Sequence, residues 1–293
     1  MLVHKLLVVW LVVCALVIIL GSVIASSIAE ALQYHYSDTF IAGMIALLQT
    51  LPEYAFMIVL TLKEKYEYSI ITIIGANILL IALGFPLVMF IGCASGAKGI
   101  KEDKALDLMR ENSVESIFLA ISGAYMIYMG IKGTIDIIDG IILLAIFIIY
   151  IYLVTRLPPE VEEEEPRGLA RFFLNRKRLS VIAMILSIFL IFIPAEYFTD
   201  GIIEISASLV STALLMAFVV PLVSEMPEKL TAYIAATKNE DLARLGITNF
   251  MSSRINNGTL LFSTMIFVIY LSLIHISEPT RPRLISYAVF CLK

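Results

Sequence analysis

Charged residues are scarce in this chain of 293 residues: 21 Lys and Arg and 25 Asp and Glu make up 16% of it. Soluble domains carry about 25% charged and about 45–50% apolar residues, whereas the apolar share here is 60%. These two departures disfavour a soluble enzyme. The sequence also lacks the basic stripe of a nucleic-acid binder, so we expect no nucleic-acid partner.

Cysteine is rare as well. Cys14, Cys93 and Cys291 form no spaced pair, and the first two lie in apolar runs, where a thiol behaves as a small hydrophobe. A disulfide framework and a cysteine-ligated metal site are therefore unsupported. No nucleophile–base pair and no cofactor loop occur in the sequence, so we expect neither catalysis nor a bound cofactor.

Long apolar runs are what the sequence has in abundance. A membrane-spanning helix needs about 20 mostly apolar residues, and the runs lack the alternation of strands, so they predict an all-α polytopic membrane protein. Eight spans are expected, at residues 5–29, 40–62, 69–92, 114–130, 136–155, 179–198, 206–237 and 246–273. The first run is alternatively a signal peptide, but its apolar core exceeds the 7–15 residues typical of one.

Loop charges predict the orientation in the cell membrane. The loops after the third, fifth and seventh spans hold twelve Lys and Arg, against four in the other loops and the N-terminus. By the positive-inside rule the N-terminus is outside. The polar segment 156–178, which contains the acidic run 162–165, is then a cytoplasmic linker. Acidic runs can attract Ca²⁺, but a solvated linker is the expectation.

An internal repeat relates the half before this linker, 1–155, to the half after it, 179–270. Residues 48–53 (LQTLPE) and 223–228 (VSEMPE) each place a Pro-Glu pair inside a predicted span. A second polar cluster follows in each half, at 75–77 (GAN) and 252–258 (SSRINNG). Because five spans precede the linker, corresponding helices run in opposite directions, which is the inverted repeat of many secondary transporters.

The Pro-Glu pairs predict an ion site. A proline inside a helix frees the carbonyl four residues back, here Leu48 and Val223. Carboxylates inside a membrane usually face an ion path, so Glu53 and Glu228 are expected to meet at the midplane. A kink with an interfacial glutamate would explain one such pair, but two matching pairs favour a site with the 6–8 oxygens that Ca²⁺ prefers.

At these residues the chain resembles the membrane domain of sodium/calcium exchangers, in the cation/calcium antiporter superfamily. Residues 50–53 (TLPE) match the end of that family's Gly-Thr-Ser-Leu-Pro-Glu signature, and 75–78 (GANI) match its Gly-Ser-Asn-Ile motif. In the second half Pro227-Glu228 matches, and Ser253 and Asn257 fall where the later motif has a serine and an Asn or Asp.

The resemblance implies an inverted-repeat antiporter with a ten-helix layout, of which eight spans are expected here, and it implies exchange of Ca²⁺ for Na⁺. A cation/proton antiporter using the same glutamates is an alternative, and a non-transporting membrane protein of the same fold is another. The candidate ion ligands are Leu48, Gln49, Thr50, Glu53, Asn77, Val223, Ser224, Glu225, Glu228, Ser253 and Asn257.

Several residues depart from the family pattern. Leu80 stands where a ligand amide is expected, Glu225 replaces a serine, and Arg254 replaces an asparagine. We expect Arg254 to neutralise Glu225, which would leave Glu53 and Glu228 as a site with a charge of −2.

The last residues, 271–293, are too polar to supply the two remaining spans. They resemble translated sequencing-adapter DNA, so we expect a non-native tail and a truncated second half. A genuine cytoplasmic or interfacial tail is the alternative.

Overall fold

The computed structural model describes residues 2–35, 50–94, 113–154, 156, 168–174, 176–206, 211–237 and 240–276. Every regular element in these ranges is a helix. Six of the helices are long and apolar enough to cross a membrane, and Leu51–Leu62 and Thr212–Ser224 are shorter apolar helices. The expectation of an all-α polytopic membrane protein is thereby confirmed, with a helix in each of the eight expected spans.

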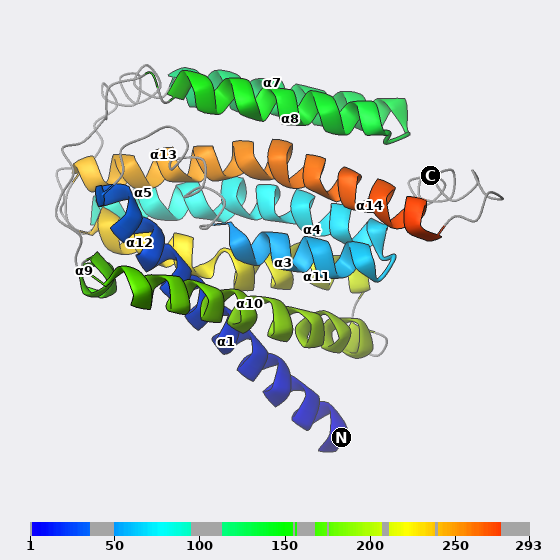
Figure 1. Cartoon of the computed structure of the whole chain (residues 1–293), viewed down its shortest axis with the longest axis horizontal. Coiled ribbons are helices and arrows are strands. Elements are labelled where there is room, and N and C mark those ends of the chain that lie inside the picture. The colour runs from blue at the N-terminus through cyan, green and yellow to red at the C-terminus, as the bar shows by residue number, and fades with distance from the viewer. Residues whose placement is uncertain are drawn as a thin grey trace.

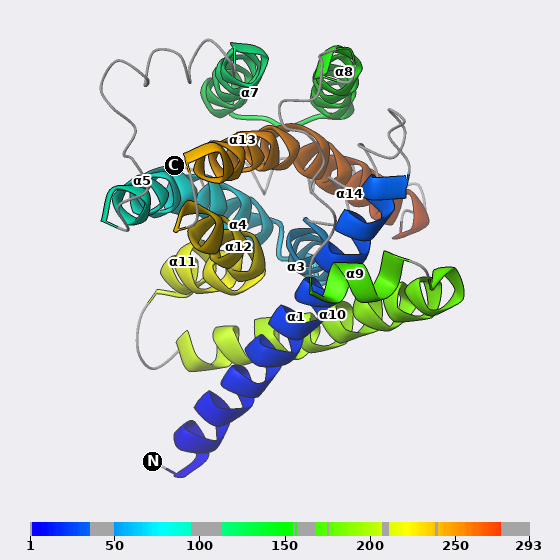
Figure 2. The same cartoon turned by 90° about the vertical axis from the view of Figure 1, so that its left-hand side faces the viewer.

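The two longest helices, α1 (Leu2–His35) and α10 (Lys177–Ser206), pack against each other. Helix α1 crosses α10 obliquely, while the other long helices lie nearly parallel to one another (Figures 1 and 2). Glycines permit the close approach: a Cβ on Gly21 of α1 would meet Ile191 Cγ1 at 2.9 Å, and one on Gly201 of α10 would meet Leu11 Cδ2 at 2.7 Å. The two helices therefore interlock at two points.

Two boundaries differ from the expectation. Helix α10 continues eight residues past the expected end at 198, because Ile202 and Ile205 bury apolar surface in the same core as Leu11 and Phe56. The linker contains a short helix, α9 (Leu169–Leu174), whose Phe173 packs with residues of α1. The linker is therefore only partly solvated.

The α1–α10 pair lies along one side of a bundle drawn from both halves (Figure 2). The first half contributes α3 (Leu51–Leu62), α4 (Tyr66–Leu79), η1 (Leu80–Gly84) and α5 (Phe85–Ala94). The second half contributes α11 (Thr212–Ser224), α12 (Met226–Ala236), α13 (Glu240–Asn256), η2 (Asn257–Leu261) and α14 (Phe262–Ile276). The segments η1 and η2 are π-helical turns at matching places in the two halves, and such turns are frequent at functional sites.

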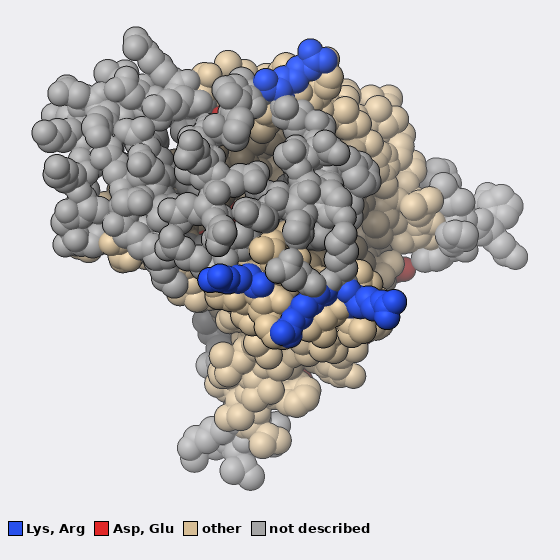
Figure 3. Space-filling model, turned by 60° about the vertical axis from the view of Figure 1, so that its left-hand side comes forward, with Lys and Arg blue, Asp and Glu red and all other residues tan. Residues whose placement is uncertain are grey.

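The hairpin of α7 (Ser113–Lys132) and α8 (Ile137–Val154) covers the α13–α14 side of this bundle (Figure 1). The helix ends that border the linker and the loops after the third and seventh spans all lie at one end of the molecule (Figure 1). Arg156, Arg171, Arg176 and Arg178 are exposed there, and Lys and Arg side chains gather on this face (Figure 3). The described members of the predicted basic group therefore lie on one side of the molecule, and the others fall outside the described side chains.

The two halves meet in backbone contact where α4 crosses α11. A Cβ on Gly75 would lie 2.1 Å from the carbonyl oxygen of Ala217, so this contact is backbone against backbone. The Thr72 hydroxyl, on the same face of α4, donates to the carbonyl of Met216 at 3.3 Å. Only glycine fits at position 75 without moving one helix.

We predict that Gly75→Ala separates α4 from α11 and lowers the melting temperature of the protein in detergent, since overpacking costs about 1–3 kcal/mol. Gly123→Ala in α7 is the matched control, because a Cβ there would meet no described atom within 4 Å. Equal melting temperatures for the two variants would contradict the crossing.

Candidate ion-binding site

Both Pro-Glu pairs lie in the first turn of a helix. Helix α3 begins at Leu51, directly before Pro52-Glu53, and α12 begins at Met226, directly before Pro227-Glu228. This corrects the expectation that both prolines lie in the interior of a helix. The physical reason is that a first turn tolerates a proline, because its missing N–H has no partner within the helix.

The same backbone geometry recurs in the two halves. The Tyr54 N–H donates to the Thr50 carbonyl at 3.2 Å, and the Lys229 N–H donates to the Glu225 carbonyl at 3.0 Å. Glu225 is the residue at which the expected seventh span breaks, between α11 and α12. Glu53 and Glu228 thus each sit at the positive end of a helix dipole, which favours a negative charge.

Glu225 is the centre of a buried ion triad. Its Oε1 lies 2.7 Å from Arg254 Nη2, and its Oε2 lies 2.8 Å from Lys229 Nζ. Glu225 and Arg254 are each 1% exposed, and Lys229 is 2% exposed. Charges removed from water are stable only when paired. The ion pair with Arg254 therefore attaches the break between α11 and α12 to helix α13.

Hydrogen bonds extend the triad to Glu228. Arg254 Nη2 donates to Ser253 Oγ at 3.3 Å, and Ser253 Oγ donates to Glu228 Oε2 at 3.1 Å. Glu53 interacts electrostatically with Glu225, Glu228 and Arg254. The three carboxylates and both cations therefore belong to one electrostatic unit.

Several buried polar atoms here have no hydrogen-bond partner among the described residues, including Glu53 Oε2, both amide atoms of Asn257, and Arg254 Nε and Nη1. Glu53 is 6% exposed, and its Oε2 makes no hydrogen bond within the described part of the chain. Asn257, in η2, is fully buried, and neither Nδ2 nor Oδ1 has a partner among the same residues. Buried polar atoms are almost always satisfied, so these oxygens are suited to hold an ion in transit.

Other expected ligands are used within the protein. Thr50 Oγ1 accepts from Asn256 Nδ2 at 2.7 Å, and Tyr54 donates to Asn256 Oδ1 at 3.4 Å. Asn77 Nδ2 donates to the carbonyl of Ile73 at 3.2 Å, and Ser224 donates to that of Pro221 at 3.4 Å, each in its own helix. Val223 is buried at the end of α11. Leu48 and Gln49 lie outside the described residues.

The sequence reasoning missed Lys229 and Asn256. Lys229 is four residues after Glu225, a spacing that pairs charges on helices, so its signal was available. With Lys229 included, Glu53, Glu225 and Glu228 face two cations, and the charge is −1 rather than −2. No three His, Cys, Asp or Glu side chains in the described ranges are grouped closely enough to hold a metal ion by themselves.

Two further ion-pair groups lie away from this site, at the other end of the helices. Lys63, after α3, pairs with Asp200 at 2.7 Å and Glu196 at 3.3 Å. Asp200 lies beyond the expected end of the sixth span at 198, but both Glu196 and Asp200 belong to α10. These pairs connect the end of α3 to α10.

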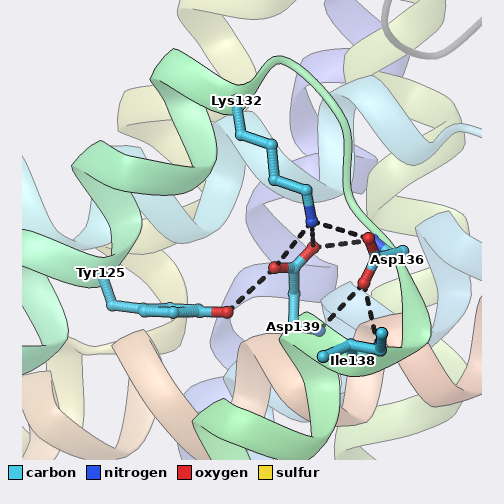
Figure 4. Close-up of polar contacts among 5 residues, drawn as sticks. All are labelled: Tyr125, Lys132, Asp136, Ile138 and Asp139. Atoms are coloured by element: carbon cyan, nitrogen blue, oxygen red, sulfur yellow. Dashed lines mark hydrogen bonds and ion pairs between the residues drawn. The ribbon is translucent and has the colours of Figure 1, made fainter.

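The other group closes the turn between α7 and α8 (Figure 4). Lys132 Nζ lies 2.6 Å from Asp136 Oδ2 and 2.9 Å from Asp139 Oδ2, and Tyr125 donates to Asp139 at 2.9 Å. Asp136 Oδ1 accepts the N–H groups of Ile138 and Asp139, which caps α8. The hydrogen bond from Lys132 lowers the pKa of Asp136 below its usual value. All these partners are internal to the hairpin, so its role is structural.

Comparison with known proteins identifies the fold. The family described as sodium/calcium exchanger protein matches residues 6–156 and 179–292. The chain belongs to the sodium/calcium exchanger family. This family match agrees with the inverted repeat and with the polytopic helices of the structure. The match continues to residue 292. Helix α14 extends to Ile276, and residues 277–292 lie outside the described part of the chain, so the foreign origin expected for 271–293 stays a prediction.

Solved exchangers share the architecture. The crystal structure of the H⁺/Ca²⁺ exchanger CAX is 25% identical, with a TM-score of 0.79, over 98% of this chain and 73% of that one. Two structures of the sodium-calcium exchanger NCX_Mj are 19% and 22% identical, with TM-scores of 0.55 and 0.54. They cover 99% and 92% of this chain, and 89% of theirs. A search of curated protein sequences finds no match.

The triad generates a stability prediction. Glu225→Gln leaves Arg254 and Lys229 buried with one fewer carboxylate, and breaking a buried pair in this way costs about 3–5 kcal/mol. We expect a large drop in melting temperature in detergent. The double variant Glu225→Gln/Lys229→Met restores the charge balance and should recover most of the loss. A melting temperature for Glu225→Gln equal to that of the parent would argue against the triad.

Proposed function

We propose that this protein is a secondary active transporter that exchanges Ca²⁺ for a monovalent cation, with Glu53 and Glu228 as the ion-binding carboxylates. The observation that carries the proposal is the convergence of these glutamates from the first turns of α3 and α12, one in each half. The Ser253 hydroxyl donates to Glu228, and Asn257, four residues further along the same helical segment, has an unpartnered amide. Membership of an exchanger family supports a transporter rather than an enzyme.

Charge explains why Ca²⁺ and its counter-ions are interchangeable at such a site. Without an ion the described groups carry −1. Ca²⁺, two protons or two Na⁺ would each change this charge to +1. The form carrying Ca²⁺ and the form carrying its counter-ions are then electrostatically equivalent, so both can change access to the two sides of the membrane.

We favour protons as the counter-ion. The solved H⁺/Ca²⁺ exchanger is 25% identical with a TM-score of 0.79, whereas the NCX_Mj structures reach only 0.55 and 0.54. Oxygen ligands for several Na⁺ ions are also depleted, because Leu80 and Arg254 stand at family ligand positions and Asn77 bonds its own helix. Na⁺ is the second candidate, supported by the family description.

We propose the orientation that the loop charges indicate. The N-terminus would lie outside the cell membrane and the 156–178 linker in the cytoplasm. The exposed arginines at the linker end of the molecule support this arrangement. We also propose that 156–178 is a cytoplasmic linker between the two membrane halves.

The first functional prediction concerns the glutamates. Glu53→Gln and Glu228→Gln each remove a carboxylate that the transported ion requires, so we expect uptake of radiolabelled Ca²⁺ into proteoliposomes to fall to the background of empty vesicles. Glu115→Gln is the matched control, since Glu115 is also a buried glutamate but lies on α7, outside the site. Full uptake by both site variants would refute the proposal.

The second prediction separates the counter-ions. With protons as the counter-ion, an acid-inside gradient in Na⁺-free medium should drive Ca²⁺ uptake, and a Na⁺ gradient at equal pH should drive far less. The reverse pattern would establish Na⁺ coupling. No uptake under either gradient would favour a non-transporting protein in which Lys229 and Arg254 hold the place of the metal.

A further inference from the structure

The ion triad holds more positive charge than its own carboxylate can balance. Lys229 and Arg254 both pair with Glu225, at 2.8 Å and 2.7 Å, and all three side chains are buried. One carboxylate therefore meets two cations, and one positive charge is left over. Because the three side chains are buried, solvent screens that charge little, and it acts on the neighbouring ionised groups.

Those neighbours are the proposed ion-binding carboxylates. Arg254 interacts electrostatically with Glu53 and Glu228, and Lys229 interacts with Glu228. Ser253 also joins the triad to Glu228 directly, because it accepts from Arg254 and donates to Glu228. The surplus charge is thus part of the environment that any ion at Glu53 and Glu228 experiences.

We infer that Lys229 and Arg254 determine ion specificity, by lowering the preference of the Glu53–Glu228 site for divalent over monovalent cations. The inference rests on the proposed function, since it assumes that these glutamates bind the transported ion. The repulsion between a fixed charge and an ion is proportional to the charge of the ion. A given surplus charge therefore weakens Ca²⁺ binding by the square of the factor by which it weakens Na⁺ binding.

Lys229→Met tests this relation. Methionine keeps an unbranched apolar chain, and Glu225 retains its pair with Arg254. For purified protein in detergent we expect Ca²⁺ affinity to rise by roughly tenfold and Na⁺ affinity, measured by competition against labelled Ca²⁺, by roughly threefold. The logarithm of the change in Ca²⁺ affinity should then be twice the logarithm of the change in Na⁺ affinity. Removal of a charge produces this ratio, whereas a loss of packing would not.

Three variants control the experiment. Lys229→Arg keeps the charge and should leave both affinities within about twofold of the parent. Glu225→Gln/Lys229→Met returns the site to −1 and should reverse the gain. Arg254→Met removes one positive charge from the other side of Glu225 and should reproduce the two-to-one ratio, which keeps the inference testable if Lys229→Met folds poorly.

The outcomes distinguish this inference from the function. The specificity role would be overturned if the variants changed Ca²⁺ affinity and Na⁺ affinity by equal factors. It would also be overturned if both affinities stayed unchanged in Lys229→Met and in Arg254→Met. Gradient-driven Ca²⁺ uptake by the parent protein would still support exchange in that case. If the parent takes up no Ca²⁺ under either gradient, exchange fails, and the ratio measured in the Met variants decides the specificity role separately.

Discussion

A carboxylate that leaves water must be met by positive charge, and Glu225 meets two cations at the point where α11 gives way to α12. Without that compensation the helix break would place a bare charge in a low-dielectric interior, at a cost of several kcal/mol. The break positions Pro227-Glu228 in the first turn of α12. The pair with Arg254 also anchors this turn to α13, which continues into η2 and presents Asn257.

The two halves have the same backbone arrangement around their Pro-Glu pairs but contribute different numbers of charged side chains. Thr50 and Glu225 occupy the same place before a Pro-Glu turn, as do Tyr54 and Lys229 after it. The π-helical turns begin at Leu80 in one half and at Asn257 in the other. Most of the charge therefore comes from the second half, while Glu53 and the Thr50–Asn256 hydrogen bond bring the first half into the site.

The sequence predicted the eight helical regions and their inverted relation because apolar runs and repeated motifs are local signals. It also predicted the pairing of Arg254 with Glu225. It did not predict that each Pro-Glu pair begins a helix, since a proline fits both a kinked interior and a first turn. The sequence also did not predict the length of α10. The apolar run ends near 198, and the helix continues past it because Ile202 packs in the core. Asn256 gave no signal, because its partners are about 200 residues away.

The interlocked helices α1 and α10 have a consequence for the surrounding lipid. With 34 and 30 residues they are about 51 and 45 Å long, well beyond the roughly 30 Å of a bilayer's hydrocarbon core. Gly21 and Gly201 fit the two helices together, so they tilt as a pair rather than one by one. Each ångström of mismatch between a helix and the bilayer costs a fraction of a kcal/mol. Bilayer thickness therefore acts as a mechanical load on this pair, and a thinner membrane favours the more tilted arrangement.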